Sequence, residues 1–589
     1  MSLEKREKLP MKKKKKSRKL SPEQMQKRKE NAFSRKIRNV FLNAGFTYIV
    51  TQNIHFTIGN RIVEIDSLLI YENIWLFCED TTLASTDKDH ILKKNEMMNE
   101  IKNNMSSMVQ KLKERCPDKE EFFDKYDVGR IKPIGLYFSE THLNLQDSDY
   151  ERFSNLTFVQ PKTLEYFKWM TQCIKHSARN EIFRFLKISN EEIGMDSSST
   201  NSKKIKAPII YPRNFVGLNG SVTRNKVRMV SFMMSAEDLL NMSYVLRKDN
   251  WDDSIDLYQR LIDKEKIKTI RKFVAEKQET FYNNIIVALP DTVRFVDKND
   301  NTKNINEIND LNGDYQLSIP YEMNSICVID GQHRIYAHYE SGLANQQEAN
   351  IAKLRKQLHL LVTGLIFPPD MTLSERIRIQ SEIFLDINST AKPVNQNVLL
   401  QIQRIINPLA DVSIAHSVLE ELNQDSLFAN KFESSSLDTG KIKTASIIKF
   451  ALKYLVTLNP LEGKNSLLYY WNGDKNAVFN MEASAIKDYV KFCCATLRVY
   501  FSAIKSRFNS EWKDPDSKLL SVISLNGFII AFNRQLSING IKDFEFYNSK
   551  FKEWNYDFSK EKFQYTSSQY RKFSNEILRD AFGLDDENL

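Results

Sequence analysis

The segment 325–342, SICVIDGQHRIYAHYESG, constrains the fold most, because an apolar run passes through an Asp-Gly pair into a helical pattern. Residues 326–329 are typical of a short buried strand, and Asp330-Gly331 supplies the turn. The spacing that follows predicts a helix that starts near Gln332 and stops at Gly342. We therefore expect a mixed α/β domain around this segment.

The polar residues at this turn suit an anion. A helix start presents free N–H groups and the positive end of the helix dipole, and phosphate fits both. Gly331 lets an anion approach the backbone, and Arg334 adds a planar donor fork. His333 can donate, accept or carry a proton near neutral pH. Asp330 can cap the helix, orient Arg334 or hold a metal-bound water. Spacing alone favours an ordinary capped helix with surface side chains.

The motif IDGQHRIYA resembles the signature of the DGQHR-domain proteins, a group that includes the DndB-like proteins of DNA phosphorothioation systems. Two further segments resemble that family in the expected order: a QR-containing helix at 257–274 with the strand after it at 281–290, and the segment 381–396. The resemblance covers residues 207–415. It implies a fold similar to ParB and sulfiredoxin, in which a glycine-led motif at a helix start binds nucleotide phosphates.

The resemblance also separates possible reactions. Gln332 stands where sulfiredoxins carry their reacting cysteine, and an amide cannot act as a thiolate nucleophile. Cys327 lies in the preceding strand, so repair of oxidised cysteine is excluded. What remains is binding of a nucleoside triphosphate with Mg²⁺, with or without hydrolysis, or contact with a DNA phosphate. Asp330, His333 and Arg334 would be the catalytic residues, and Asp330 or His333 would position water.

Secondary candidates flank this motif. Gln259 and Arg260 belong to the QR segment, where Arg260 can reach a phosphate or pair with a neighbouring carboxylate. Asn388 can hydrogen-bond a ligand or cap the chain after its helix. The predicted phosphate-binding set is Gly331, Gln332, His333, Arg334, Gln259, Arg260 and Asn388.

The N-terminal module has a different order of elements. A helix with Phe33, Ile37, Val40 and Phe41 on one face ends at Gly45, and extended segments follow at 48–58, 61–71 and 74–82. A long helix at 87–115 and a strand at 133–139 come next. This order resembles the core of the PD-(D/E)XK nucleases, in which an acidic residue ends one strand and the next strand ends in Glu-x-Lys.

Two acidic residues occupy the matching positions. Asp66 and Glu79 are predicted to meet and to hold Mg²⁺, which prefers oxygen ligands and activates water for phosphodiester attack. Thr81 stands where the family has its lysine, which makes nuclease activity the weaker expectation. Lys88, Lys93 or Lys94 can replace that lysine, but the sequence places none of them. The alternative is that both acids are half-buried strand residues, or that the module binds DNA without cutting it.

Positive charge is concentrated at the start of the chain. Residues 1–30 hold thirteen Lys or Arg against four Glu, so most of the net charge of +10 lies there. Such an arm is too polar to pack, and it can attract nucleic acid by releasing counterions or serve as a solvated tail. The residues predicted to contact nucleic acid are Lys12, Lys13, Lys14, Lys15, Lys16, Arg18 and Lys19.

Cysteine use and hydropathy limit the cellular compartment in which the protein is expected. The six cysteines form no CxxC pair, the start shows no signal pattern, and no run of 18 apolar residues occurs. We expect a reduced, cytoplasmic protein with no membrane partner.

The predicted fold is an α/β (α+β) multidomain chain: a basic arm at 1–30, a nuclease-like module at 31–195, a linker at 196–206, the DGQHR domain at 207–415 and a mostly helical domain at 416–589.

The leading functional prediction is a DNA-associated DGQHR protein of a bacterial DNA-modification or phage-defence system that binds a nucleoside triphosphate at the motif. The expected partners are DNA and other proteins of such a system. A DndB-like DNA-binding regulator without enzymatic activity is the first alternative. A metal-dependent nuclease acting through the N-terminal module is the second.

Overall fold

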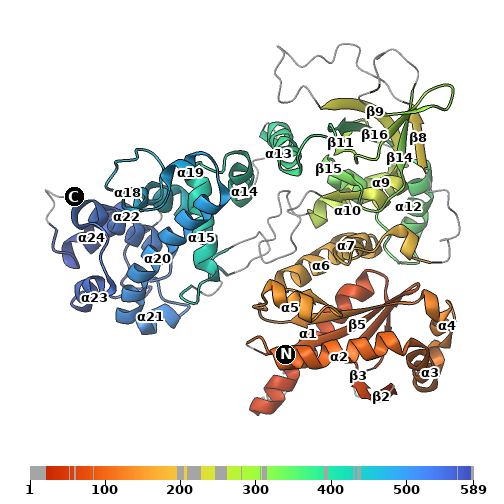
Figure 1. Cartoon of the computed structure of the whole chain (residues 1–589), viewed down its shortest axis with the longest axis horizontal. Coiled ribbons are helices and arrows are strands. Elements are labelled where there is room, and N and C mark those ends of the chain that lie inside the picture. Colours follow the sequence, from red (N-terminus) through yellow and green to blue (C-terminus); the bar gives the residue numbers. More distant parts are fainter. Residues whose placement is uncertain are drawn as a thin grey trace, which may run out of the picture. The chain divides into compact units, whose positions relative to one another are not determined.

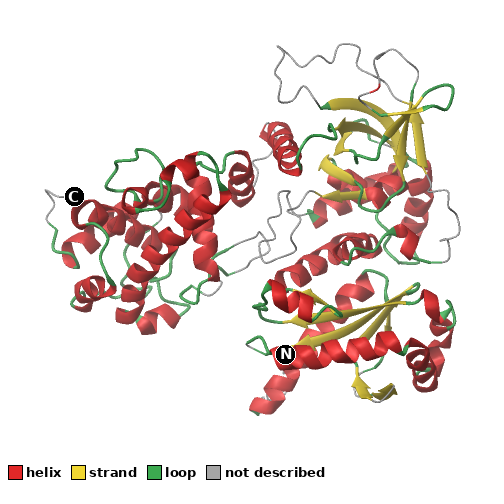
Figure 2. Ribbon diagram, in the orientation of Figure 1, coloured by secondary structure: helices red, strands yellow, loops and turns green. Residues whose placement is uncertain are grey.

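The chain folds into two compact units in the computed structural model, shown in Figure 1 and Figure 2. Unit 1 comprises Met1–Leu164 with Ile193–Met195, and unit 2 comprises Glu165–Glu192 with Asp196–Leu589. The structure describes residues 21–51, 54–58, 61–83, 85–194, 204–208, 227–245, 262–279, 281–304, 307, 315–389, 396–428, 431–433, 440–566 and 568–584.

A mixed five-stranded sheet forms the centre of unit 1. Neighbouring strands pair in the order β1-β4-β5-β6-β7, antiparallel from β1 to β5 and parallel from β5 to β7. A separate hairpin joins β2 to β3. The elements are α1 (Pro22–Asn43), β1 (Thr47–Ile49), β2 (His55–Ile58), β3 (Arg61–Glu64), β4 (Ser67–Tyr71), β5 (Ile74–Thr81), α2 (Lys88–Asn103), α3 (Met105–Arg115), α4 (Glu120–Phe123), β6 (Lys132–Ser139), α5 (Asp147–Arg152) and β7 (Leu156–Val159).

Helix α1 follows the sequence pattern closely. Ser21 and Gln24 form a capping box at its start, and Pro22 occupies the first turn, where a missing N–H costs nothing. The predicted apolar face of Phe33, Ile37, Val40 and Phe41 is buried. Gly45 follows the helix with φ +85°, which confirms it as the stop.

Three predicted elements of unit 1 are interrupted. The extended segment expected at 48–58 divides into β1 and β2, which pair with different strands. The helix expected at 87–115 breaks at Asn104, whose φ of −124° and ψ of 37° are not helical; its backbone and side-chain amides both donate to the Glu100 carbonyl oxygen at 3.1 Å. The strand expected at 61–71 divides between Glu64 and Ser67. β3 pairs with β2 in the hairpin, whereas β4 pairs with β1 and β5. Asp66 therefore lies in the bend that separates the two pairings.

Unit 2 contains two further sheets. A mixed sheet has the order β10-β15-β11-β16-β9, and an antiparallel sheet has the order β13-β12-β14-β8. The strands are β8 (Lys204–Pro208), β9 (Arg228–Ser235), β10 (Ser243–Val245), β11 (Ile285–Ala288), β12 (Arg294–Val296), β13 (Thr302–Lys303), β14 (Gln316–Pro320), β15 (Ile326–Asp330) and β16 (His359–Ile366).

Helices cover the mixed sheet of unit 2. Cys327 and Ile329 of β15 pack in one apolar cluster with Ile379 and Phe384 of α13, and a second small cluster joins α10 to α12. The helices of this part are α6 (Pro161–Ile174), α7 (Arg179–Phe185), α9 (Ala236–Met242), α10 (Lys264–Lys277), α11 (Gln332–Tyr336), α12 (Gln346–Gln357), α13 (Leu373–Ser389) and α14 (Gln396–Ile406).

The C-terminal region is mostly helical, as the sequence predicted. Its core is rich in aromatic rings, such as Tyr500, Phe528 and Phe551, which pack mainly edge to face. The larger helices are α15 (Asp411–Gln424), α20 (Ala483–Arg507), α22 (Val522–Asn539), α23 (Phe544–Lys552) and α24 (Tyr570–Asp580). Among the helices that the structure describes, none combines the length and the apolar character needed to cross a bilayer.

Candidate functional sites

The two predicted acids of unit 1 lie across from each other at one edge of the sheet. Ser67 of β4 pairs with Cys78 of β5, so Asp66 and Glu79 occupy the next opposed positions. The backbone amide of Asp80 donates to Asp66 Oδ2 at 3.0 Å, which fixes the Asp66 carboxylate beside β5. Glu79 is 1% exposed, whereas Asp66 is half-buried. One of the two carboxylates can therefore be reached from solvent.

Lys94 supplies the positive charge that Thr81 lacks. Its ammonium forms an ion pair with Glu79 Oε2 and donates to the Glu64 carbonyl oxygen at 3.3 Å. The side chain of Lys94 is 13% exposed, so a helix residue rather than a strand residue places a nearly buried ammonium at the carboxylates. Of the three lysines that the sequence offered, Lys94 is therefore the one at this site.

Burial and like charge set the electrostatics of these groups. Burial raises the pKa of Glu79 well above its usual range, Asp66 raises it further, and Lys94 opposes both. Burial alone would lower the pKa of Lys94, but Glu79 and Asp66 reverse the effect and raise it. Lys94 therefore keeps its charge, while Glu79 resists ionisation unless more positive charge arrives.

Helices α1 and α2 contact opposite faces of β5 at this edge. Successive side chains of a strand point to opposite faces, so Glu79 turns toward Lys94 of α2 while Asp80 turns toward α1. Ser34 of α1 donates to Asp80 Oδ1 at 2.9 Å. Burial, with Asp66 as the next cause, raises the pKa of Asp80 to about 7.

A histidine and a tyrosine extend the α2 side of the site. His90 lies one turn before Lys94, and its Nδ1 is 2.8 Å from the Tyr137 hydroxyl. Tyr137 of β6 is paired with Glu79 of β5 in the sheet. The sequence did not single out either residue, because a histidine four positions before Lys94 does not indicate a shared site until α2 is placed on the sheet.

The donor set of this site fits a hard cation. Glu79 Oε1 is buried and meets no hydrogen-bond donor within the described ranges. Mg²⁺ commonly binds through one or two carboxylates and keeps several waters, which matches the pair Asp66 and Glu79. Among the residues that the structure describes, no three His, Cys, Asp or Glu side chains gather into a larger metal-binding group.

The DGQHR motif occupies the predicted strand end in unit 2. β15 ends at Asp330, and Gly331 has φ +97°, a left-handed conformation that favours glycine. A Cβ on Gly331 would lie 3.0 Å from Ile285 Cγ1 and 3.1 Å from Arg334 Nη2. Glycine is thus required both by the backbone angle and by the close approach of β11.

The helix after Gly331 is much shorter than the sequence predicted. α11 ends at Tyr336 rather than at Gly342, and the amides of Arg334 and Ile335 both donate to the Gly331 carbonyl oxygen, at 2.9 and 3.2 Å. Gly331 and Gln332 are also buried. The expected row of free amides is therefore reduced at this turn.

Arg334 is turned toward Asp330. Its Nη2 donates to Asp330 Oδ2 at 2.9 Å, so Asp330 orients the arginine, one of the three roles that the sequence left open. Arg334 Nη1 is buried and has no hydrogen-bond partner in the described part of the chain. Burial lowers the pKa of Arg334, and Asp330 opposes that effect. His333 lies nearby, and its Nε2 accepts from the Asp263 amide at 2.9 Å.

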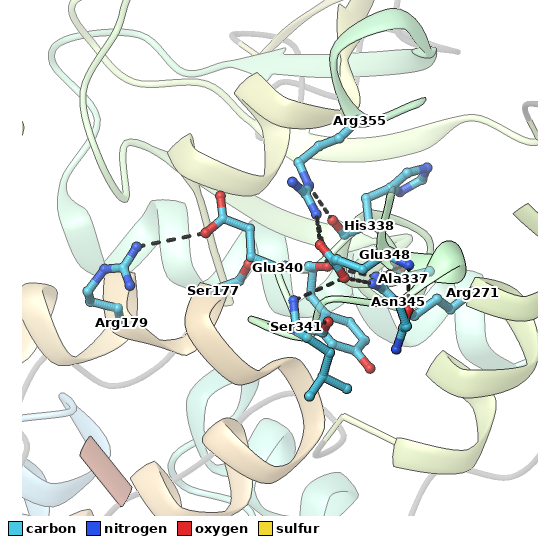
Figure 3. A network of polar contacts seen from close by, with 12 residues as sticks. Ser177, Arg179, Arg271, Ala337, His338, Glu340, Ser341, Asn345, Glu348 and Arg355 are labelled. Atoms are coloured by element: carbon cyan, nitrogen blue, oxygen red, sulfur yellow. Dashed lines mark hydrogen bonds and ion pairs between the residues drawn. The ribbon is translucent and has the colours of Figure 1, made fainter. Parts of the chain in front are cut away.

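A buried ionic network holds the chain beyond α11, as Figure 3 shows. Arg271 of α10 donates to the carbonyls of Ala337 and Tyr339 at 3.0 and 2.6 Å and pairs with Glu348. Arg355 of α12 donates to the His338 carbonyl at 2.7 Å and to Glu348 Oε1 at 3.0 Å. Sequence reasoning missed these residues, since two arginines and a glutamate at ordinary helical positions give no signal.

Several predicted residues lie outside the described part of the chain. They are Gln259, Arg260 and the basic arm residues Lys12, Lys13, Lys14, Lys15, Lys16, Arg18 and Lys19. Asn388 falls within α13, but its side chain is outside the described set. Their predicted roles remain predictions.

Comparison of the chain with protein-family models, curated proteins and solved structures gives no match.

Proposed function

We propose that unit 1 is a metal-dependent phosphodiesterase that cleaves DNA. The observation that carries this proposal is the placement of Lys94 beside Glu79, opposite Asp66. The order of α1, β1, β4, β5, α2 and β6 supports the resemblance to the PD-(D/E)XK nuclease core. The resemblance to DGQHR-domain proteins supports a setting in bacterial DNA modification or phage defence.

The residues of the site divide the work. Asp66 and Glu79 would hold Mg²⁺, which when bound polarises a phosphodiester and activates water. Lys94 keeps a fixed positive charge next to these carboxylates, where it can stabilise negative charge that develops on the attacked phosphate. Asp80 fixes the Asp66 carboxylate through its backbone amide. Thr81 needs no part in this scheme.

Plasmid DNA incubated with the full chain and Mg²⁺ or Mn²⁺ tests the proposal. We expect nicking or linearisation that Asp66→Asn, Glu79→Gln and Lys94→Met each reduce at least about 100-fold, the usual scale for loss of one charge-stabilising group. Lys93→Met is the matched control, because Lys93 is the exposed neighbour of Lys94 on α2. Cleavage that survives Lys94→Met, or that Lys93→Met removes equally, contradicts the assignment.

A second candidate function lies at the DGQHR motif of unit 2. The observation that favours it is Arg334 Nη1, a buried guanidinium donor without a partner in the described residues, next to the oriented pair with Asp330. Such a donor suits an oxygen of a nucleoside triphosphate or of DNA. The short α11 makes Arg334, rather than backbone amides, the main contact.

Titration with ATP, CTP and GTP, each with Mg²⁺, tests the second candidate. We expect saturable binding of one nucleotide that Arg334→Ala weakens at least about 10-fold, the scale of one charge-assisted hydrogen bond. Arg378→Ala, a partly exposed arginine on α13, is the control. Steep salt dependence of DNA binding without any nucleotide effect would favour the regulator alternative instead.

A further inference from the structure

Helix α1 carries a stripe of basic side chains. Lys27, Arg28 and Arg35 are exposed, and no ion pair or hydrogen bond of their side chains occurs within the described residues. Positions 28 and 35 are seven residues apart and lie nearly in line along the helix, whereas position 27 lies about 100° around the helix from position 28. Arg38 lies nearly in line with Lys27, is partly buried and donates to the Tyr48 hydroxyl at 3.3 Å. These four residues are called the α1 stripe.

The same part of α1 is fixed to the strand ends that carry the candidate site. Gln26 Nε2 donates to Thr82 Oγ1 at 2.9 Å, directly after β5. Lys29 pairs with Glu140 at 2.6 Å, directly after β6. With the bond from Ser34 to Asp80, these contacts place residues 26–34 along the edge where Glu79 lies. The α1 stripe lies on the outer side of α1, away from the buried face, at the end of the sheet that carries the carboxylate site, whereas Glu79 and Lys94 lie on the α2 face.

We propose that the α1 stripe binds the phosphate backbone of the nucleic acid that unit 1 cleaves. This inference rests on the proposed function and adds the surface that holds the substrate. From Lys27 to Arg38 the helix rises about 16 Å, at 1.5 Å per residue, which matches roughly five phosphates of one strand along a duplex axis. Lys27, Arg28 and Arg35 form no ion pair within the described residues, so none of those contacts is lost when they bind phosphate.

Nucleic acid fits this surface better than a lipid membrane. A helix that lies on a bilayer needs an apolar face beside its cations. The large exposed apolar residues of α1 are Met25 and Leu42, near its two ends, while the buried face packs on the sheet. The surface around the stripe is otherwise polar, as suits a phosphate backbone that contributes through charge.

Salt-dependent binding tests the α1 stripe without relying on cleavage. The binding assay uses the full chain with the substitution Asp66→Asn, in EDTA to remove divalent metal. The probe is a short labelled DNA, either duplex or single-stranded. We expect Lys27→Gln/Arg28→Gln/Arg35→Gln to reduce the slope of log K against log salt by about 2 to 3, near 0.9 for each phosphate contact on a duplex. The control Lys487→Gln/Lys491→Gln/Lys513→Gln removes the same charge from exposed sites in unit 2 and should keep the slope.

The outcomes separate the two proposals. An unchanged slope in the stripe variant, or an equal loss of slope in the control, contradicts the proposal that the α1 stripe binds nucleic acid. Failure of the wild-type chain to cleave DNA contradicts only the proposal that unit 1 is a nuclease. Binding to phosphatidylserine vesicles in place of DNA would also contradict the proposal for the α1 stripe.

A direct contact test uses Arg28→Cys with a photo-crosslinker, since the six native cysteines are buried. Cross-linking to DNA is expected at position 28 and not with Lys487→Cys.

Discussion

Arg271 of α10 and Glu348 of α12 form a buried ion pair that also secures the backbone after the DGQHR helix. The exposed fractions of the two side chains are 4% and 15%. Arg355 contacts the same carboxylate, so one glutamate balances two guanidinium groups. Removing one partner of a buried pair leaves an uncompensated charge, which costs more than the pair itself contributes.

The first prediction concerns this network. Glu348→Ala should lower the free energy of unfolding by about 3–5 kcal/mol, because Arg271 and Arg355 lose their counter-charge in a buried place. Thermal unfolding by calorimetry, at constant protein concentration, measures the effect. Lys353→Ala, an exposed position on the same helix, should stay within about 0.5 kcal/mol of the parent. A loss below about 1 kcal/mol for Glu348→Ala would show that the arginines find other partners.

The second prediction concerns the turn between β15 and α11. Gly331→Ala should destabilise unit 2 by about 1–3 kcal/mol, since alanine resists φ +97° and its Cβ would press on Ile285. Gly129→Ala is the matched control, because among the described residues no heavy atom beyond Gly129 and its chain neighbours lies within 4 Å of the added Cβ. Equal melting temperatures for the two variants would contradict the strain at Gly331.

The third prediction is a pH dependence set by His338. Burial lowers the pKa of His338 to about 4 from its usual 6.5. Between these values the unfolded chain binds a proton that the folded chain does not, so stability is full above about pH 6.5 and falls as pH drops toward 4. The total loss is about 3 kcal/mol at 1.36 kcal/mol per pH unit.

An asparagine variant isolates this contribution. The Nδ1 of His338 lies 2.9 Å from the Arg334 carbonyl oxygen, and the amide of Asn can reach the same acceptor without titrating. His338→Asn should therefore lose less stability than the parent between pH 6.5 and 4 in urea unfolding. Parallel pH profiles for both chains would show that His338 is not the titrating group.

The fourth prediction concerns the cost of the carboxylate pair in unit 1. Asp66→Asn should raise stability by about 1 kcal/mol at pH 8 without divalent metal, because it removes the like charge beside buried Glu79 and keeps an oxygen for the Asp80 amide. Thermal unfolding compares it with Glu121→Gln, an exposed acid of unit 1. Destabilisation by Asp66→Asn would mean that the Asp66 charge is needed for folding.

Periodicity was enough to predict much of the fold. The buried face of α1 follows from apolar spacing that local structure preserves. The mixed α/β character and the helical C-terminal region follow from the same patterns. The ends of helices and strands were harder to predict from the sequence. Helix α11 stops early because Arg271 and Arg355 bind the carbonyls after it, and both arginines come from distant segments.

The candidate sites were predicted in part for the same reason. Asp66 and Glu79 could be paired from the strand pattern, since opposed positions of a hairpin are fixed by register. The choice of Lys94 over Lys88 and Lys93 required the rotation of α2 on the sheet, which depends on tertiary packing. Lys88 instead binds Asp149 at 2.7 Å, and Lys93 is exposed.

The position of Lys94 on a helix has a consequence for finding relatives. A linear pattern that demands a cation two places after the glutamate would reject this chain at Thr81. A three-dimensional template of two carboxylates and one ammonium would keep it, and would also retrieve proteins whose ammonium comes from another segment. In such relatives the residue at position 81 is free to vary. A relative that lacks the lysine at position 94 should carry another basic residue near the two carboxylates.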